Sequence, residues 1–233
     1  PVSLSVDVYQ ISRSQDYANQ GYDQLSNGGS LRLGYAFQGD WDAWKVYNTY
    51  RYQSDVYSNP TAGLIIPIGQ ENVSSITPSI SRDTRDNIFD ASTGTFNTLS
   101  VTLAGGYLGG DKHYVKPVYD SRAFFTTPAI FGWTWLHRFV LGLHGRVGYA
   151  TPYDPGTGLS DVPISERFYM GGTDTVRGYG ERSLGGDAAL TGGNLTLLSN
   201  IEYGFKPAPP IKLRAFYDSG NIWNSISDVD LSH

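Results

Sequence analysis

The chain has 233 residues, which is enough for one large β domain or two small ones. It contains no cysteine, which excludes disulfides and thiolate metal sites, and its net charge of −5 argues against a nucleic-acid binder. Its 28 glycines and 17 tyrosines favour β-structure with many turns and aromatic-rich surfaces. No apolar run in the sequence approaches the ~18 residues of a membrane-spanning helix.

The dominant period along the chain is two, which predicts strands and not helices. In a typical stretch, Leu31, Leu33 and Tyr35 share one face, while polar or small residues occupy the other. We expect about nine strands, near residues 1–11, 27–38, 43–56, 74–84, 95–106, 112–125, 134–150, 191–206 and 211–223.

The length of these segments favours a membrane barrel over a soluble sandwich. Ordinary strands have about 5–6 residues, whereas a tilted membrane-spanning strand needs about 9–11. The mean hydropathy of −0.30 does not oppose this interpretation, because a barrel strand shows only one face to lipid. The predicted fold class is therefore all-β, an antiparallel transmembrane β-barrel.

The second face of the predicted strands is charged, as expected for a barrel with lipid outside and a wet lumen inside. Its charged residues are Arg32, Lys45, Arg51, Lys116, Asp120, Arg122, Arg138, Arg146, Glu202, Lys212, Arg214 and Asp218. Aromatic residues near strand ends resemble interfacial girdles; they are Trp41, Trp44, Phe131, Trp133, Trp135 and Trp223. A soluble two-sheet sandwich with one charged face remains the alternative at this point.

The connections between the predicted strands are unequal in length. Residues 39–42, 86–94 and 206–210 form short turns, whereas 151–190 is a long loop of about forty residues, far beyond the usual connection. Short turns on one side and long loops on the other are typical of outer-membrane barrels. No domain boundary is visible, so we expect one barrel domain over 1–233.

The sequence contains no recognisable set of catalytic residues. Its four histidines, His113, His137, His144 and His233, lack metal-ligand spacing, and we expect His144 to be a solvated lumen residue. Neither a nucleotide-binding glycine motif nor a serine nucleophile elbow occurs. We therefore expect a protein that is not an enzyme and that uses no metal or other cofactor.

The most informative motif lies in the long loop, in Val176, Arg177, Gly178, Tyr179 and Gly180. Glycine allows a tight fold-back with positive φ. A single guanidinium carried by such a turn is expected to pair with a carboxylate, because a desolvated charge without a partner has a high free-energy cost. The alternative is a surface arginine in a glycine-rich turn.

Two carboxylates could pair with Arg177. Glu202 and Asp218 lie on the polar faces of the two strands that follow the loop, and counting by two places both inward. We therefore expect both to be lumen partners of Arg177.

The stretch from 166 to 223 resembles the outer-membrane insertase superfamily, in particular its branch of β-barrel assembly factors. The resemblance is carried by Val176–Gly180, Gly192–Asn194, Asn200–Tyr203 and Phe216–Trp223, and by Ser81–Asp86 with Thr93 and Gly94. It covers residues 74–223 well and the first seventy weakly.

The resemblance implies a sixteen-stranded barrel in the bacterial cell outer membrane, preceded by periplasmic POTRA domains. It implies that the loop 151–190 folds into the lumen, where Arg177 contacts Glu202 and Asp218. It also implies insertion and folding of nascent outer-membrane proteins, with the lipid bilayer, unfolded client barrels and periplasmic accessory lipoproteins as partners. Neither nucleic acid nor a nucleotide is expected.

The nine predicted strands correspond to roughly the fifth to the thirteenth of the family's sixteen. We expect the POTRA domains and the first and last barrel strands to lie outside this chain. The alternative function is that of a two-partner secretion transporter of the same superfamily, which shares the arginine-bearing loop and exports a single protein substrate.

Overall fold

The structure is a computed structural model, and it describes residues 1–16, 20–64, 66–126, 139–153, 162–185, 188–208 and 211–229. Its long strands are β1 (Val2–Arg13), β2 (Asp23–Ala36), β3 (Trp44–Ser58), β4 (Gly69–Asp83), β5 (Gly94–Ala104), β6 (Tyr114–Thr126), β7 (Phe139–Tyr149), β9 (Leu195–Ala208) and β10 (Ile211–Trp223). The short elements are β8 (Thr151–Pro152), α2 (Ala188–Thr191) and the 3-10 turns η2 (Gly39–Trp41), η3 (Gly106–Leu108), η6 (Ile164–Glu166) and η7 (Ile226–Asp228).

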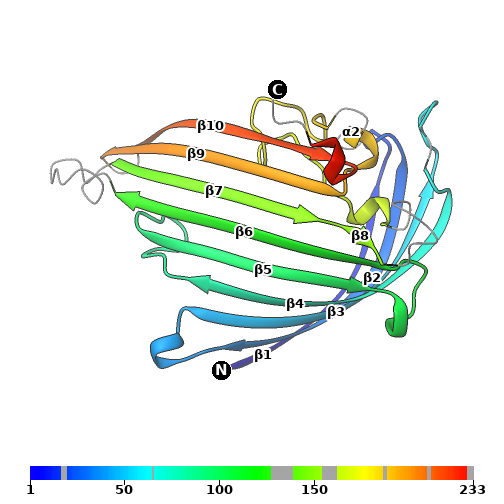
Figure 1. The fold of residues 1–233 in the computed structure, drawn as a ribbon, viewed down its shortest axis with the longest axis horizontal. Helices are drawn as coiled ribbons and strands as arrows, with labels where there is room; N and C mark the ends of the chain where they lie inside the picture. Colours follow the sequence, from blue (N-terminus) through cyan, green and yellow to red (C-terminus); the bar gives the residue numbers. More distant parts are fainter. Residues whose placement is uncertain are drawn as a thin grey trace.

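The strands form one antiparallel, strongly curved sheet (Figure 1). Its hydrogen-bonded path runs β1-β2-β3-β4-β5-β6-β7-β9-β10, and the short β8 pairs with β6. Every long strand therefore pairs with its neighbours in sequence, as in a series of hairpins. The predicted all-β antiparallel fold class is confirmed.

Burial in this sheet is inverted relative to a soluble protein. Apolar side chains on the convex face are exposed to the surroundings. The exposed fractions of Leu4, Leu33 and Leu213, for example, are 62%, 51% and 59%. Buried positions include polar and charged side chains such as Asp55 and Asn200. A soluble sandwich would bury the aliphatic face, so the pattern favours lipid outside and polar groups inside.

Several strands begin or end at different residues from those predicted. β2 begins at Asp23 and β4 at Gly69, four and five residues earlier than expected, while β3 continues to Ser58. Backbone pairing persists there, from Asp23 opposite Ser58 to Tyr57 opposite Gly69. The polar side chains at this end break the alternation of hydrophobicity, so the pattern underestimates strand length.

The predicted strand near 134–150 is described only as β7 from Phe139. The strand near 191–206 begins later, at Leu195, because α2 ends at Thr191, Gly192 turns with φ of +75° and Gly193 pairs with Phe168. The predicted features at Phe131, Trp133, Trp135, His137, Arg138 and His233 lie outside the described residues.

Two further observations concern Trp223 and the helices. Trp223, expected in an interfacial girdle, is instead only 9% exposed; this expectation was wrong, and the Trp223 backbone lies against Gly193 and accepts from the Asn194 amide at 2.9 Å. Among the described residues, no helix is long and apolar enough to span a membrane.

Candidate functional site

The long loop before β9 folds back against the concave face of the sheet. We call its described part, residues 162–185 and 188–194, the arginine loop. Backbone bridges join Phe168 to Gly193 and Met170 to Leu184, so the loop forms a nested hairpin. This hairpin carries two polar segments to the sheet, which we call the base (Pro163–Arg167) and the tip (Thr175–Gly178).

The structure brings Arg177 at the tip into contact with both predicted carboxylates. Its Nε and Nη2 atoms donate to Oδ2 and Oδ1 of Asp218, each at 2.7 Å, and its Nη1 donates to Oε1 of Glu202 at 2.6 Å. The Arg177 backbone amide also donates to Asp218 Oδ2 at 3.0 Å. A fork-like bidentate contact of this kind is strong and orients both partners.

Neighbouring side chains complete the arrangement around Arg177. The guanidinium lies 3.8 Å from the ring centre of Phe216, a cation–π distance. Asn200 donates to Asp218 Oδ1 at 2.9 Å and to the carbonyl oxygen of Thr175 at 2.7 Å. Hydrogen bonding to Asp218, with a further contribution from Glu202, raises the pKa of Arg177 above its ordinary value, so it stays charged.

Two glycines make this docking possible. Gly178, directly after the arginine, has φ of +89°, a backbone conformation that favours glycine, and it turns the tip back. On β10, a Cβ atom at Gly220 would lie 2.8 Å from the Met170 sulfur and 2.7 Å from the Leu197 carbonyl oxygen. The loop therefore packs against the sheet at a position where only glycine leaves room.

Apolar packing holds the tip beside its polar contacts. Met170 and Val176 from the loop form a buried cluster with Leu198 of β9 and Ile222 of β10. The arginine is thus presented by a segment that is itself packed on the sheet, which limits its freedom to leave the carboxylates.

The other predicted members of the motif lie at the tip or just after it. Val176 is buried, while Tyr179 is 56% exposed. The backbone carbonyl oxygen of Tyr179 accepts a hydrogen bond from the Gly172 amide at 3.1 Å. The carbonyl of Gly180 accepts from the Ser183 side chain at 2.8 Å. These residues shape the turn, and within the motif only Arg177 brings a charge to the sheet.

The Arg177 site continues across three strands as a polar chain. His144 on β7 contacts Asn200 through Nδ1 at 2.8 Å and Asp120 on β6 through Nε2 at 3.1 Å. Asp120 in turn accepts from Arg146 Nε at 2.7 Å. His144 was expected to be a solvated lumen residue; it lines the cavity beside the tip, its side chain is 17% exposed, and its cross-strand register also places it beside Asn200.

A cavity of about 390 Å³ adjoins the tip, between the β4–β5 turn and the sheet. Its lining includes Arg85, Asp90, His144, Arg177, Glu202 and Arg214. Asp90 of that turn pairs with Lys206 and Lys212 at 2.9 Å each, so the turn reaches the ends of β9 and β10. Among the described residues, no group of His, Asp and Glu has the arrangement of a metal site.

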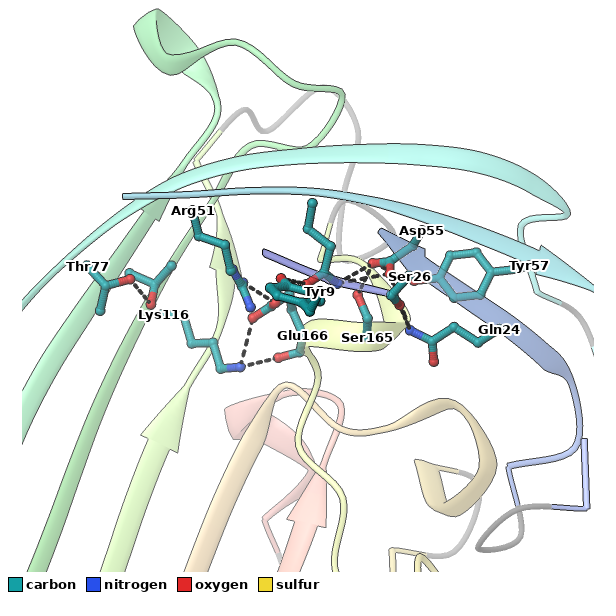
Figure 2. A network of polar contacts seen from close by, with 12 residues as sticks. Tyr9, Gln24, Ser26, Arg51, Asp55, Tyr57, Thr77, Lys116, Ser165 and Glu166 are labelled. Atoms are coloured by element: carbon teal, nitrogen blue, oxygen red, sulfur yellow. Dashed lines mark hydrogen bonds and ion pairs between the residues drawn. The ribbon is translucent and has the colours of Figure 1, made fainter. Parts of the chain in front are cut away.

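Sequence reasoning missed a second polar site at the base of the loop. Glu166 pairs there with Arg51 from β3 and Lys116 from β6 (Figure 2). The signal available in the sequence was two inward cations, Arg51 and Lys116, that had no assigned partner. Their pairing with a loop residue depends on the path of the loop, which the pattern does not contain.

Comparisons with known proteins identify the family of this chain. A family model described as the Omp85 superfamily domain matches residues 1–232. The chain belongs to the Omp85 superfamily.

Relatives of this Omp85 chain include two proteins named outer membrane protein assembly factor BamA. The one from Nitratidesulfovibrio vulgaris is 31% identical over 195 residues, which is 79% of this chain and 23% of the relative. The one from Neisseria meningitidis is 34% identical over 98 residues, which is 37% of this chain and 12% of the relative. The chain thus spans less than a quarter of the length of these relatives.

The fold is also similar to a crystal structure of BamA from Haemophilus ducreyi lacking POTRA domains 1–3, with a TM-score of 0.77 at 18% identity. That match covers 96% of this chain and 47% of the solved chain. The resemblance to β-barrel assembly factors and the location in the bacterial outer membrane, both predicted from the sequence, are confirmed.

Proposed function

We propose that this Omp85 chain is a barrel segment of an insertase that folds nascent β-barrel proteins and inserts them into the outer membrane. The observation that carries the proposal is the docking of Arg177 on Asp218 and Glu202. The names of the BamA relatives, assembly factors for outer membrane proteins, support it.

In this proposal the arginine loop keeps the inner wall of the barrel in one shape. Arg177 joins β9 to β10 through Glu202 and Asp218, and the Met170 and Val176 cluster packs on both strands. A barrel wall held in this way could offer a defined surface to a folding client without itself unfolding. The lipid bilayer, unfolded client barrels and periplasmic accessory lipoproteins are the proposed partners.

The chain needs no catalytic residue or cofactor for this activity. An unfolded client strand has unpaired backbone groups, which are costly in lipid, and it gains free energy when it buries its apolar face and closes its own edge. The insertase would lower the barrier to that process, and the client would supply the driving force. Nucleotide and nucleic acid have no part in the proposal.

The test is an Arg177→Ala variant of the full-length protein as the sole copy in a depletion strain. We expect loss of heat-modifiable, folded client barrels, together with protease cleavage within the arginine loop. Normal client assembly with a protected loop would refute the proposed role. Loss of one secreted protein with unchanged barrel assembly would indicate a transporter of the same superfamily instead.

A further inference from the structure

We propose that Glu166 is a second anchor of the arginine loop, a positioning residue that holds the base on β3 and β6 independently of Arg177. Figure 2 shows the Glu166 side chain between Arg51 and Lys116, with Ser165 beside Asp55. The proposal concerns how the loop is held. Its link to client assembly rests on the proposed function.

The contacts of Glu166 are those of a buried, doubly paired carboxylate. Its Oε1 atom accepts from Arg51 Nη2, its Oε2 atom lies 3.3 Å from Lys116 Nζ, and Lys116 also donates to its backbone carbonyl. The Glu166 side chain is 10% exposed, against 29% for Arg51 and 17% for Lys116. A carboxylate this buried needs such partners, because an unpaired buried charge is strongly destabilising.

The residue before Glu166 makes a second contact with the same strand. Ser165 donates to Asp55 Oδ2 at 2.7 Å, and Asp55 lies four positions after Arg51, on the same face of β3. Asp55 is fully buried and also accepts from Ser26 and Gln53. The base therefore lies on polar side chains of β2, β3 and β6, some of which are already hydrogen-bonded to one another.

The two anchors share no partner and lie on different strands. The base contacts β3 and β6, whereas the tip contacts β9 and β10. Their apolar support differs as well, since Ile164 of the base packs with Tyr22 and Tyr57, and Val176 of the tip packs with Leu198. Sites without shared partners behave nearly independently, so releasing one need not release the other.

Because the chain contains no cysteine, introduced thiols can report on each anchor separately. Ile164 and Val176 are 3% and 4% exposed, so Ile164→Cys reports on the base and Val176→Cys on the tip. Each is placed in a cysteine-free full-length protein in outer-membrane vesicles, with and without Glu166→Gln, and the rate of maleimide labelling is measured.

We expect Glu166→Gln to speed labelling of the Ile164→Cys thiol at least about tenfold, because local opening of the base becomes cheaper. Labelling of the Val176→Cys thiol should stay within about twofold of the parent. Unchanged labelling at Ile164→Cys would overturn the anchor, and faster labelling at both thiols would overturn its independence from Arg177.

A matched control and a coupled variant separate anchoring from general loosening. Asp83→Asn removes another paired carboxylate, which contacts Arg85 at 2.8 Å at the last residue of β4, and should leave both labelling rates unchanged. In an Arg51→Met background the effect of Glu166→Gln should shrink, whereas Arg51→Lys should preserve it. If Glu166→Gln speeds labelling of the Ile164→Cys thiol by the same factor in the Arg51→Met background as in the parent, Glu166 does not act through Arg51.

Client assembly is then measured in the same Glu166→Gln strain. Faster labelling of the Ile164→Cys thiol together with impaired client assembly supports a positioning role for Glu166 in the proposed function. Faster labelling of the Ile164→Cys thiol with normal client assembly would show that Glu166 anchors the base but that this anchor is not needed for assembly. The proposed function itself is decided separately, by the Arg177→Ala variant.

Discussion

Arg177 and Asp218 lie 41 positions apart in the chain and are joined by three hydrogen bonds, two from the guanidinium at 2.7 Å and one from the arginine's own backbone amide at 3.0 Å. The side chain and the main chain of one residue are thus fixed by a single carboxylate. This relationship requires both the charge of the arginine and the position of its backbone. It therefore depends on the turn at Gly178 as much as on the arginine itself.

Replacing Arg177 by lysine should be almost as harmful as replacing it by alanine. Lysine keeps the charge but cannot form the planar, bidentate contact with Asp218 while also reaching Glu202. We expect a loss of about 2–3 kcal/mol in the docking of the loop. Limited proteolysis of the Arg177→Lys protein measures this loss, and a cleavage rate equal to that of the parent would contradict it.

Asp218 should matter more than Glu202. Its side chain is 2% exposed and accepts from Arg177 and Asn200, whereas the Glu202 side chain is 30% exposed and also contacts Arg214 at 3.4 Å. Asp218→Asn should cost about 2–3 kcal/mol and Glu202→Gln about 1 kcal/mol or less. Thermal unfolding of both variants in detergent measures the difference.

Charge reversal at Asp218 should also reproduce the assembly defect expected for Arg177→Ala. If an Asp218→Lys strain assembled its client barrels normally, Glu202 would be the main partner of Arg177.

Gly220→Ala should loosen the tip through steric conflict alone. The added methyl would meet the Leu197 carbonyl at 2.7 Å and the Met170 sulfur at 2.8 Å, and the carbonyl belongs to the neighbouring strand. Overpacking of this kind costs about 1–3 kcal/mol. Gly204→Ala on β9 is the control, since its nearest neighbour would be 3.7 Å away; equal melting temperatures for the two variants would contradict the prediction.

The contribution of Glu166 to stability should disappear in acid. Burial, the strongest influence on this group, opposes its ionisation, but Lys116 and Arg51 outweigh burial and lower the pKa of Glu166 below its ordinary value of 4.5. Since the folded-state pKa lies below the unfolded one, the stabilisation is complete above about pH 4.5 and is lost as the pH falls through the folded-state value.

The measurement compares thermal unfolding of the parent and Glu166→Gln proteins from about pH 7 to about pH 3. The parent should be more stable near neutrality, and the two curves should converge in acid. Every carboxylate other than Glu166 is present in both proteins, so the difference between the two curves reports on the charge of Glu166. A gap that stayed constant with pH would show that the charge of Glu166 is not the source of its effect.

Phe216→Leu should weaken the tip slightly while keeping an apolar side chain. The ring of Phe216 faces the Arg177 guanidinium at 3.8 Å, and losing this contact should cost about 0.5–1 kcal/mol. Phe216→Tyr retains an aromatic face and should behave like the parent. The comparison uses the same protease-protection assay, in which equal rates for the two variants would argue against a cation–π contribution.

The sequence by itself determined the face on which each strand residue lies, because side chains alternate strictly along a strand. That alternation was enough to place Glu202 and Asp218 inward and to indicate the antiparallel barrel. The glycines around Arg177 were enough to indicate a tight turn, and the motifs from 166 to 223 were enough to indicate the superfamily.

Only the tertiary structure decided which inward groups meet. Glu166 lies 115 positions from Arg51 and 50 from Lys116, and they come together through the curvature of the sheet and the path of the loop. The same holds for His144, which joins the Arg177 site through cross-strand register, and for Trp223, which is buried at the end of β10. The alternation of side chains along a strand assigns each residue to one face of the sheet, whereas contact between distant residues depends on how the whole sheet bends.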